Sequence, residues 1–141
     1  MTACLMHPFD RCVGVELLDS LYKSSVEMKA VYDNYVEESM ASSPEASKMP
    51  KFEVNHGDLL EFDWWSEADL VLANSTCFEF NLMLEISERA SKMKKGSWMI
   101  TLTKKLPSAD PIHERDPLKR DWECVLSIKM VMSWGYATVN I

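Results

Sequence analysis

The segment Ala68-Asp69-Leu70-Val71-Leu72-Ala73-Asn74 is the strongest strand signal in the chain and decides the fold class. Its second half is apolar without interruption, which is typical of a strand buried on both faces in a parallel sheet. The run ends abruptly at Asn74-Ser75-Thr76. Apolar and small residues then recur at helical spacing, which predicts a helix with one face in the core; they are Phe80, Met83, Ile86, Ser87, Ala90 and Met93.

Strands and helices alternate in the same way over the rest of the chain. We predict strands over 11–18, 51–56, 68–74 and 97–103, helices over 18–40 and 80–93, and two closing strands over 124–128 and 136–141. Asp19 is expected to cap the first helix. The alternation predicts an α/β fold with a parallel sheet, and the closing strands are too near each other for a helical crossover, so they should pair antiparallel. A mostly parallel sheet with a C-terminal antiparallel hairpin is typical of Rossmann-like methyltransferases.

Length and composition indicate a single globular domain over residues 1–141. The chain has 141 residues, of which 47% are hydrophobic and 26% charged. Its net charge of -7 argues against direct nucleic-acid binding, which depends on neutralising phosphates with Lys and Arg. No apolar stretch approaches the roughly 20 residues needed to span a bilayer, and the N-terminus lacks the pattern of a signal peptide. We therefore expect an intracellular protein without a membrane segment.

The cysteines and histidines give no sign of a metal site or a disulfide framework. The four cysteines form no CxxC pair, so free, buried thiols in a reducing compartment are expected. The three histidines are scattered, and no ligand spacing typical of zinc occurs. A nicotinamide-dependent oxidoreductase is also disfavoured, because the phosphate-binding GxGxxG motif is absent.

Polar residues stand at the ends of three predicted strands, where open parallel sheets bind their ligands. Glu16 can accept hydrogen bonds from ribose hydroxyls or complement the start of a helix. Asp58 can accept from an adenine amino group or hold a turn. Asn74 can orient an amine or a carboxylate, or cap the next helix. The three are expected to meet at one edge of the sheet.

Several short blocks, in this order, resemble the Dot-one family of non-SET histone lysine methyltransferases. They are Val13-Gly14-Val15-Glu16, Gly57-Asp58-Leu59-Leu60, the segment from Ala68 to Phe78, and Lys95-Gly96-Ser97-Trp98-Met99-Ile100-Thr101. Ser133-Trp134 before the last strand also fits the family. The resemblance implies a Rossmann-like fold that uses S-adenosylmethionine.

The resemblance also implies roles for individual residues. Glu16 would hold the ribose hydroxyls of the cofactor, and Asp58 with Leu59 would meet the adenine. Asn74 would lie at the methyl-transfer end of the site, and Phe78 would help to wall the channel. A protein substrate, a histone, and a nuclear location are implied by the resemblance alone.

The chain departs from the family pattern in two respects. The glycine-rich cofactor loop and the first strand are missing, so we expect a partial domain with weak or no binding of S-adenosylmethionine. The strands ending at Glu16 and Asn74 must then pair directly, have their gap filled by another chain, or belong to a fragment, and exposed strand edges predict self-association. The acidic charge argues against a nucleosome substrate. The alternative function is a non-catalytic Rossmann-like binding or assembly module that has lost the cofactor loop.

Overall fold

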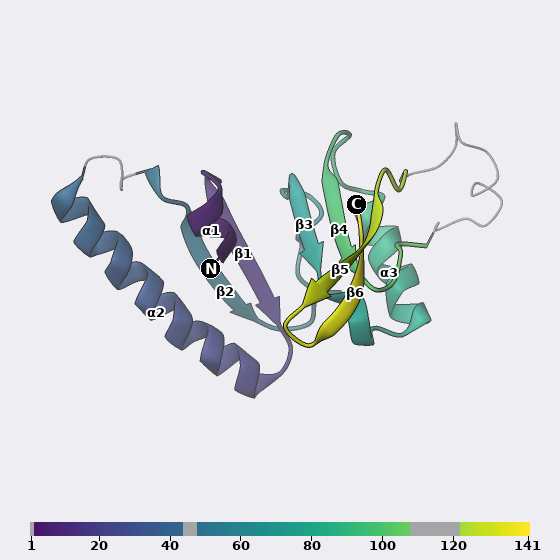
Figure 1. The fold of residues 1–141 in the computed structure, drawn as a ribbon, viewed down its shortest axis with the longest axis horizontal. Coiled ribbons are helices and arrows are strands. Elements are labelled where there is room, and N and C mark those ends of the chain that lie inside the picture. The colour runs from purple at the N-terminus through teal and green to yellow at the C-terminus, as the bar shows by residue number, and fades with distance from the viewer. Residues whose placement is uncertain (1, 44–47, 108–121) are drawn as a thin grey trace. The chain divides into compact units, whose positions relative to one another are not determined.

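A computed structural model of the chain describes residues 2–43, 48–107 and 122–141 (Figure 1). The chain divides into two compact units, Met1–Phe62 and Asp63–Ile141, which are described separately below. Strands and helices follow one another in the predicted order, preceded by one further short helix. The loop after residue 43 and most of the predicted connection from Lys104 to Arg120 lie outside the described residues.

The first unit is a two-stranded parallel sheet packed against a long helix. It contains α1 (Thr2–Met6), β1 (Arg11–Glu16), α2 (Asp19–Ser42) and β2 (Lys51–His56). The two strands pair in parallel from Arg11 opposite Lys51 to Glu16 opposite His56. A parallel pair needs a crossover of a dozen or more residues, and α2 supplies it.

Helix α2 is amphipathic, and its less exposed side packs against the sheet. Residues 22, 25, 29, 32, 36 and 39, spaced three or four apart, are the less exposed positions of the helix. Tyr32 is 3% exposed, and its ring meets the edge of Phe52 at a centroid distance of 5.5 Å. Its hydroxyl donates a hydrogen bond to the carbonyl oxygen of Pro50 at 2.7 Å. Cys4 of α1 completes this core cluster.

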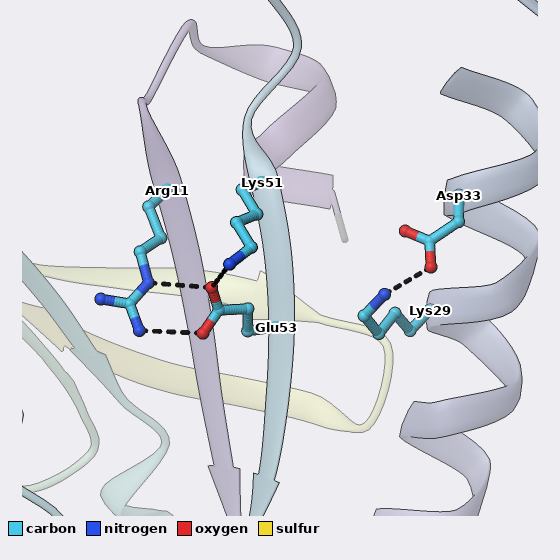
Figure 2. Close-up of polar contacts among 5 residues, drawn as sticks. All are labelled: Arg11, Lys29, Asp33, Lys51 and Glu53. Atoms are coloured by element: carbon cyan, nitrogen blue, oxygen red, sulfur yellow. Dashed lines mark hydrogen bonds and ion pairs between the residues drawn. The ribbon is translucent and has the colours of Figure 1, made fainter. Parts of the chain in front are cut away.

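Ionic contacts join β1 to β2 on the surface of the sheet (Figure 2). Arg11 donates two hydrogen bonds to the carboxylate of Glu53, at 3.1 Å from Nε and 2.8 Å from its terminal nitrogen. Lys51 adds an ion pair of 2.8 Å to the same carboxylate. These contacts lower the pKa of Glu53 from its ordinary 4.5 to about 2, chiefly through the hydrogen bonds from Arg11 and then Lys51. On α2, Lys29 and Asp33 form a separate pair.

The second unit is a four-stranded mixed sheet with one described α-helix. Its elements are β3 (Leu70–Ala73), η2 (Ser75–Cys77), α3 (Phe80–Ala90), β4 (Trp98–Leu102), β5 (Ser127–Met132) and β6 (Gly135–Asn140). The strand order is β3-β4-β6-β5, with β3 and β4 parallel and β6 antiparallel to both of its neighbours. Met83, Ile86, Ser87 and Ala90 form the buried face of α3. The helix therefore presents most of the face that the sequence predicts.

The α/β class and the antiparallel C-terminal hairpin are confirmed. The single Rossmann-like sheet is not confirmed, because the described strands form two sheets. Direct pairing of the strands that end at Glu16 and before Asn74, one of three alternatives, does not occur among the described residues: β1 pairs with β2, and β3 with β4. The single-domain assignment over residues 1–141 stays a prediction.

Some element boundaries differ from the predicted ones, each for a local reason. Leu18, not Asp19, is the N-cap of α2, because the side chain of Glu16 binds the backbone there. Phe80, the first residue of α3, is 66% exposed and does not share the buried face that its spacing predicts. Strand β5 covers Ser127–Met132 and not the predicted 124–128, and it continues up to a tight turn in which Gly135, at φ 132°, closes the hairpin.

Candidate functional site

Glu16 and the segment that holds Asp58 stand side by side at the carboxyl end of the first sheet. Glu16 is the last residue of β1, and His56, which pairs with it, is the last of β2. The chain then turns, and the backbone N–H of Gly57 donates to the carbonyl oxygen of Glu16 at 3.0 Å. Asp58 follows directly. The structure thus brings Glu16, Asp58 and Leu59 to the same end of one sheet, whereas Asn74, the third residue expected at this edge, belongs to the second unit.

The carboxylate of Glu16 already serves the start of helix α2. Its Oε1 atom accepts a hydrogen bond of 2.8 Å from the backbone N–H of Leu18, the N-cap residue. Glu16 therefore complements the start of a helix, which is one of the two roles that the sequence left open for it. A carboxylate has two acceptor oxygens with about four lone-pair positions, so this single bond leaves capacity for a ligand hydroxyl. The side chain is partly exposed.

Asp58 holds a turn at the same place. Its Oδ1 atom accepts a hydrogen bond of 2.8 Å from the backbone N–H of Leu60, and its carbonyl oxygen accepts from Glu61 and Phe62. This is the self-bonding turn that aspartate favours. Because the turn uses one carboxylate oxygen, the other can still accept from a ligand amino group. Leu59, the next residue, is partly buried.

His56, which pairs with Glu16, stacks on Tyr22, and sequence reasoning singled out neither ring. The two rings stack with centroids 4.7 Å apart and an interplanar angle of 9°. The Nε2 atom of His56 lies 3.1 Å from the carbonyl oxygen of Leu17. The ring pair therefore ties the beginning of α2 to the end of β2 beside the candidate ribose acceptor. No motif signals this contact, since it joins residues 34 positions apart in different elements.

Asn74 lies at the carboxyl end of β3 in the second unit, within a network of hydroxyl groups. Its Oδ1 atom accepts a hydrogen bond of 3.1 Å from Oγ1 of Thr76. The same hydroxyl lies 3.2 Å from Oγ1 of Thr103, which follows β4. Asn74 is the N-cap residue of the short helix η2, but its side chain makes no capping bond. The capping alternative for this side chain is therefore not observed.

The loop around Asn74 is anchored to the strand beside it. Ser75 is fully buried, and its hydroxyl donates to the carbonyl oxygen of Leu102 at 2.7 Å. The ammonium group of Lys104 donates to the carbonyl oxygen of Phe78. The first bond connects the segment after β3 with the last residue of β4, and the second connects it with the segment after β4. The backbone that carries Asn74 and Phe78 is thus held from two points.

The predicted site residues consequently fall into two groups. Glu16, Asp58 and Leu59 belong to the first unit, and Asn74 and Phe78 to the second. Within each unit the predicted residues gather at the carboxyl ends of parallel strands. Thr76 and Thr103 are additional residues of the second group. The sequence analysis named Thr76 only as part of the Asn74-Ser75-Thr76 run that ends a predicted strand. Nothing in the sequence pattern indicated Thr103.

The described residues contain neither a cluster of metal ligands nor a helix that could span a membrane. Within 2–43, 48–107 and 122–141, no three His, Cys, Asp or Glu side chains gather closely enough to hold a metal ion. No helix in that part of the chain has the length and apolar character to cross a bilayer. All four cysteines are free, but the expectation that they are buried is met only by Cys4, since Cys12 is partly buried and Cys77 and Cys124 are exposed.

Comparison with known proteins gives one family. The family model described as "Histone methylation protein DOT1" matches residues 1–138. A search of curated proteins finds no match to the chain. The matched range contains every residue of both groups described above.

Proposed function

Because the chain belongs to the DOT1 histone methylation family and its function is of the histone-methyltransferase type, we propose that it binds S-adenosylmethionine and methylates a histone lysine. The observation that carries the cofactor proposal is the placement of Glu16 and Asp58 at adjoining ends of two parallel strands. Open α/β sheets bind their ligands at such strand ends. No observation among the described residues favours the non-catalytic alternative.

The donor and acceptor groups of the first unit fit the adenosine part of the cofactor. Glu16 uses one carboxylate oxygen for the N–H of Leu18, which leaves the other for ribose hydroxyls. Asp58 likewise uses one oxygen for its turn, and the other can accept from the adenine amino group. Hydrogen bonds to a carboxylate are roughly twice as strong as neutral ones, so two such acceptors can fix the orientation of a nucleoside. Leu59 would supply an apolar contact to the base.

The second unit is proposed to receive the methyl acceptor. When bound, S-adenosylmethionine supplies a methyl group that is carried on a positively charged sulfur. An attacking amine would displace this sulfur in line. The task left to the protein is to orient the incoming lysine and keep water away. Asn74, with amide donor and acceptor atoms at the end of β3, would orient the incoming amine. Phe78 would form part of the wall around it.

The charge of the chain favours a basic protein substrate. The segment 1–62 contains 5 Lys and Arg against 11 Asp and Glu, whereas the rest of the chain has 10 against 11. The negative charge is thus concentrated in the first unit, where it would attract a basic histone segment and repel DNA. We therefore propose that the substrate is a free histone rather than a histone in a nucleosome. We also propose that the protein acts in the nucleus.

Calorimetric titration with S-adenosylmethionine tests the cofactor proposal on the full chain. In keeping with the expected weak binding, we expect one site of low affinity per chain, weakened further in Glu16→Ala and retained in Glu27→Gln, a control that removes an exposed acid from α2. A titration without heat, checked by ligand-observed NMR, would contradict the cofactor proposal. Methyl transfer to free histones and to nucleosomes then tests the substrate, and a preference for nucleosomes would contradict the charge argument.

A further inference from the structure

The hydroxyl network around Asn74 has a defined direction. The Oδ1 atom of Asn74 can only accept, so the hydroxyl of Thr76 must donate its single hydrogen to it, over 3.1 Å. The contact of 3.2 Å between the hydroxyls of Thr76 and Thr103 must then be donated by Thr103. The order of donation is therefore Thr103 to Thr76 to Asn74. It joins the end of β4 to the end of β3 through side chains alone.

Thr103 is held in a backbone conformation that a β-branched residue rarely adopts. Its φ is 69°, and it is the one described non-glycine residue with a positive φ. Its N–H donates to the carbonyl oxygen of Thr138 in β6 at 2.6 Å, which fixes the backbone at this point. Unfavourable backbone conformations of this kind persist where the surrounding structure enforces them, and they cluster at functional sites.

We propose that Thr103 is a positioning residue that fixes the side-chain amide of Asn74 through Thr76. With Oδ1 engaged by Thr76, the amide plane has one orientation, and its Nδ2 donors face away from this bond. Among the described residues, Nδ2 has no hydrogen-bond partner. The network would thus present two oriented N–H donors to an acceptor oxygen of a bound molecule. That use rests on the proposed function, whereas the fixing of Asn74 does not.

Side-chain NMR of Asn74 in the free protein tests the fixing directly. In the wild type we expect a rigid amide group, and in Thr103→Val and Thr76→Val an order parameter below about 0.6, typical of flexible groups. Thr103→Ser keeps the hydroxyl and should restore the rigid amide. An amide that stays rigid in both valine variants would overturn the proposal.

Thr103→Gly separates positioning from stability. Glycine adopts a positive φ without strain, so this variant should fold at least as stably as the wild type while losing the hydroxyl. We expect a mobile Asn74 amide in a protein with a raised melting temperature. A rigid amide in this variant would also overturn the proposal, and the result does not depend on whether a valine variant folds.

Thr101 provides the matched control on the same strand. Its hydroxyl is buried and has no hydrogen-bond partner among the described residues. Thr101→Val removes a threonine hydroxyl from β4 and should leave the amide of Asn74 rigid. If Thr101→Val made this amide as mobile as Thr103→Val does, the effect would be general loosening of β4 and the proposal would fail.

Methyl-transfer kinetics provide the functional readout. Thr103→Val should lower the rate about tenfold in the wild-type background and should have no further effect when Asn74 is already alanine, because Thr103 acts through Asn74. Equal effects in both backgrounds would overturn the positioning role. Absence of methyl transfer in every form, together with a rigid amide in the free wild type, would contradict the proposed function and leave the fixing of Asn74 supported.

Discussion

The backbone N–H of Leu18 donates a hydrogen bond of 2.8 Å to Oε1 of Glu16, so the residue that ends β1 also binds the start of α2. The carboxylate proposed to bind ribose is therefore held in place by the helix that follows it. Negative charge at a helix N-terminus is favourable, because it complements the helix dipole. The structural and the ligand-binding interpretations of Glu16 are thus compatible.

Substitution of Glu16 should separate these two contributions. Glu16→Ala removes both, and we expect cofactor affinity to fall at least about tenfold, since a hydrogen bond to a charged group contributes roughly 1.5–3 kcal/mol. Glu16→Gln keeps an acceptor for the N–H of Leu18, so it should weaken binding while changing the melting temperature less than Glu16→Ala. Titration calorimetry and thermal unfolding measure the two effects. Equal affinity in wild type and both variants would refute the ribose assignment.

The contacts of Glu53 should make the first unit sensitive to acid. Its pKa is lowered from 4.5 to about 2, first by the hydrogen bonds from Arg11, so the ionised form stabilises the folded state. This stability is fully present above about pH 4.5 and is lost as the pH falls towards 2. Glu53→Gln should therefore be less stable than the wild type near neutral pH, and the difference should vanish in acid. Urea unfolding over a pH series measures it.

Asp33→Asn is the control for Glu53. It breaks the pair with Lys29 on α2, and exposed pairs of this kind contribute little to stability. The variant should unfold close to the wild type at every pH tested. A stability loss in Asp33→Asn as large as in Glu53→Gln would mean that general surface charge, not the contacts between β1 and β2, sets the acid sensitivity.

The four cysteines should differ sharply in reactivity. Burial, and next the contact with Cys4, raise the pKa of Cys12 from 9.0 to about 11, whereas Cys77 and Cys124 are exposed. Because the thiolate is the reactive form, a pKa two units higher leaves about 100-fold less of it near pH 8. Iodoacetamide should label Cys77 and Cys124 well before Cys12, as read by peptide mass spectrometry. Labelling of Cys12 as fast as Cys124 would contradict this, and in concentrated urea all four should react alike.

Strand β1 should promote association of copies through its open edge. Asp10 and Glu16 accept bonds from Lys51 and Gly57 through their carbonyl oxygens, so even-numbered residues turn their backbone groups towards β2. The backbone groups of Val13 and Val15 therefore face away from β2, and no described strand pairs with that edge. An unpaired edge is a template for a strand from a second copy.

Val13→Pro removes one outward N–H and should lower the fraction of dimers in sedimentation velocity. Gly14→Ala is its control, because the backbone groups of Gly14 face β2 and an added methyl group would meet Val54 at an ordinary 3.7 Å. A wild type that stays monomeric at the highest concentration reached would contradict the self-association prediction.

The order of the elements could be predicted because each depends on local patterning. The apolar run 70–73 and the helical spacing around Met83 and Ile86 identify their elements without knowledge of distant contacts. Helix α1 was not predicted, since it is five residues long and lacks acidic residues in its first turn and basic residues in its last. Its Cys4 packs with Tyr32 and Phe52 of later elements, a tertiary contact that no local pattern contains.

The candidate site could be predicted only in part for a related reason. Glu16, Asp58 and Asn74 were found because strand ends can be located from the sequence, and strand ends are where ligands bind in α/β folds. Their internal partners depend on geometry: the turn bond of Asp58 is local, but the hydroxyl of Thr103 reaches Thr76 from 27 positions away. The unusual φ of Thr103 has no signature in its residue type.

The pairing of β1 with β2 across α2 also constrains the order in which the first unit folds. Arg11 and Glu53 are 42 positions apart, whereas α2 is held by local bonds and by pairs such as Lys23 with Asp19. Long loops close slowly, so we expect the helix to form before the rate-limiting step and the strand pair after it. In stopped-flow experiments, Lys23→Gly should then slow folding, whereas loss of Glu53 should mainly speed unfolding.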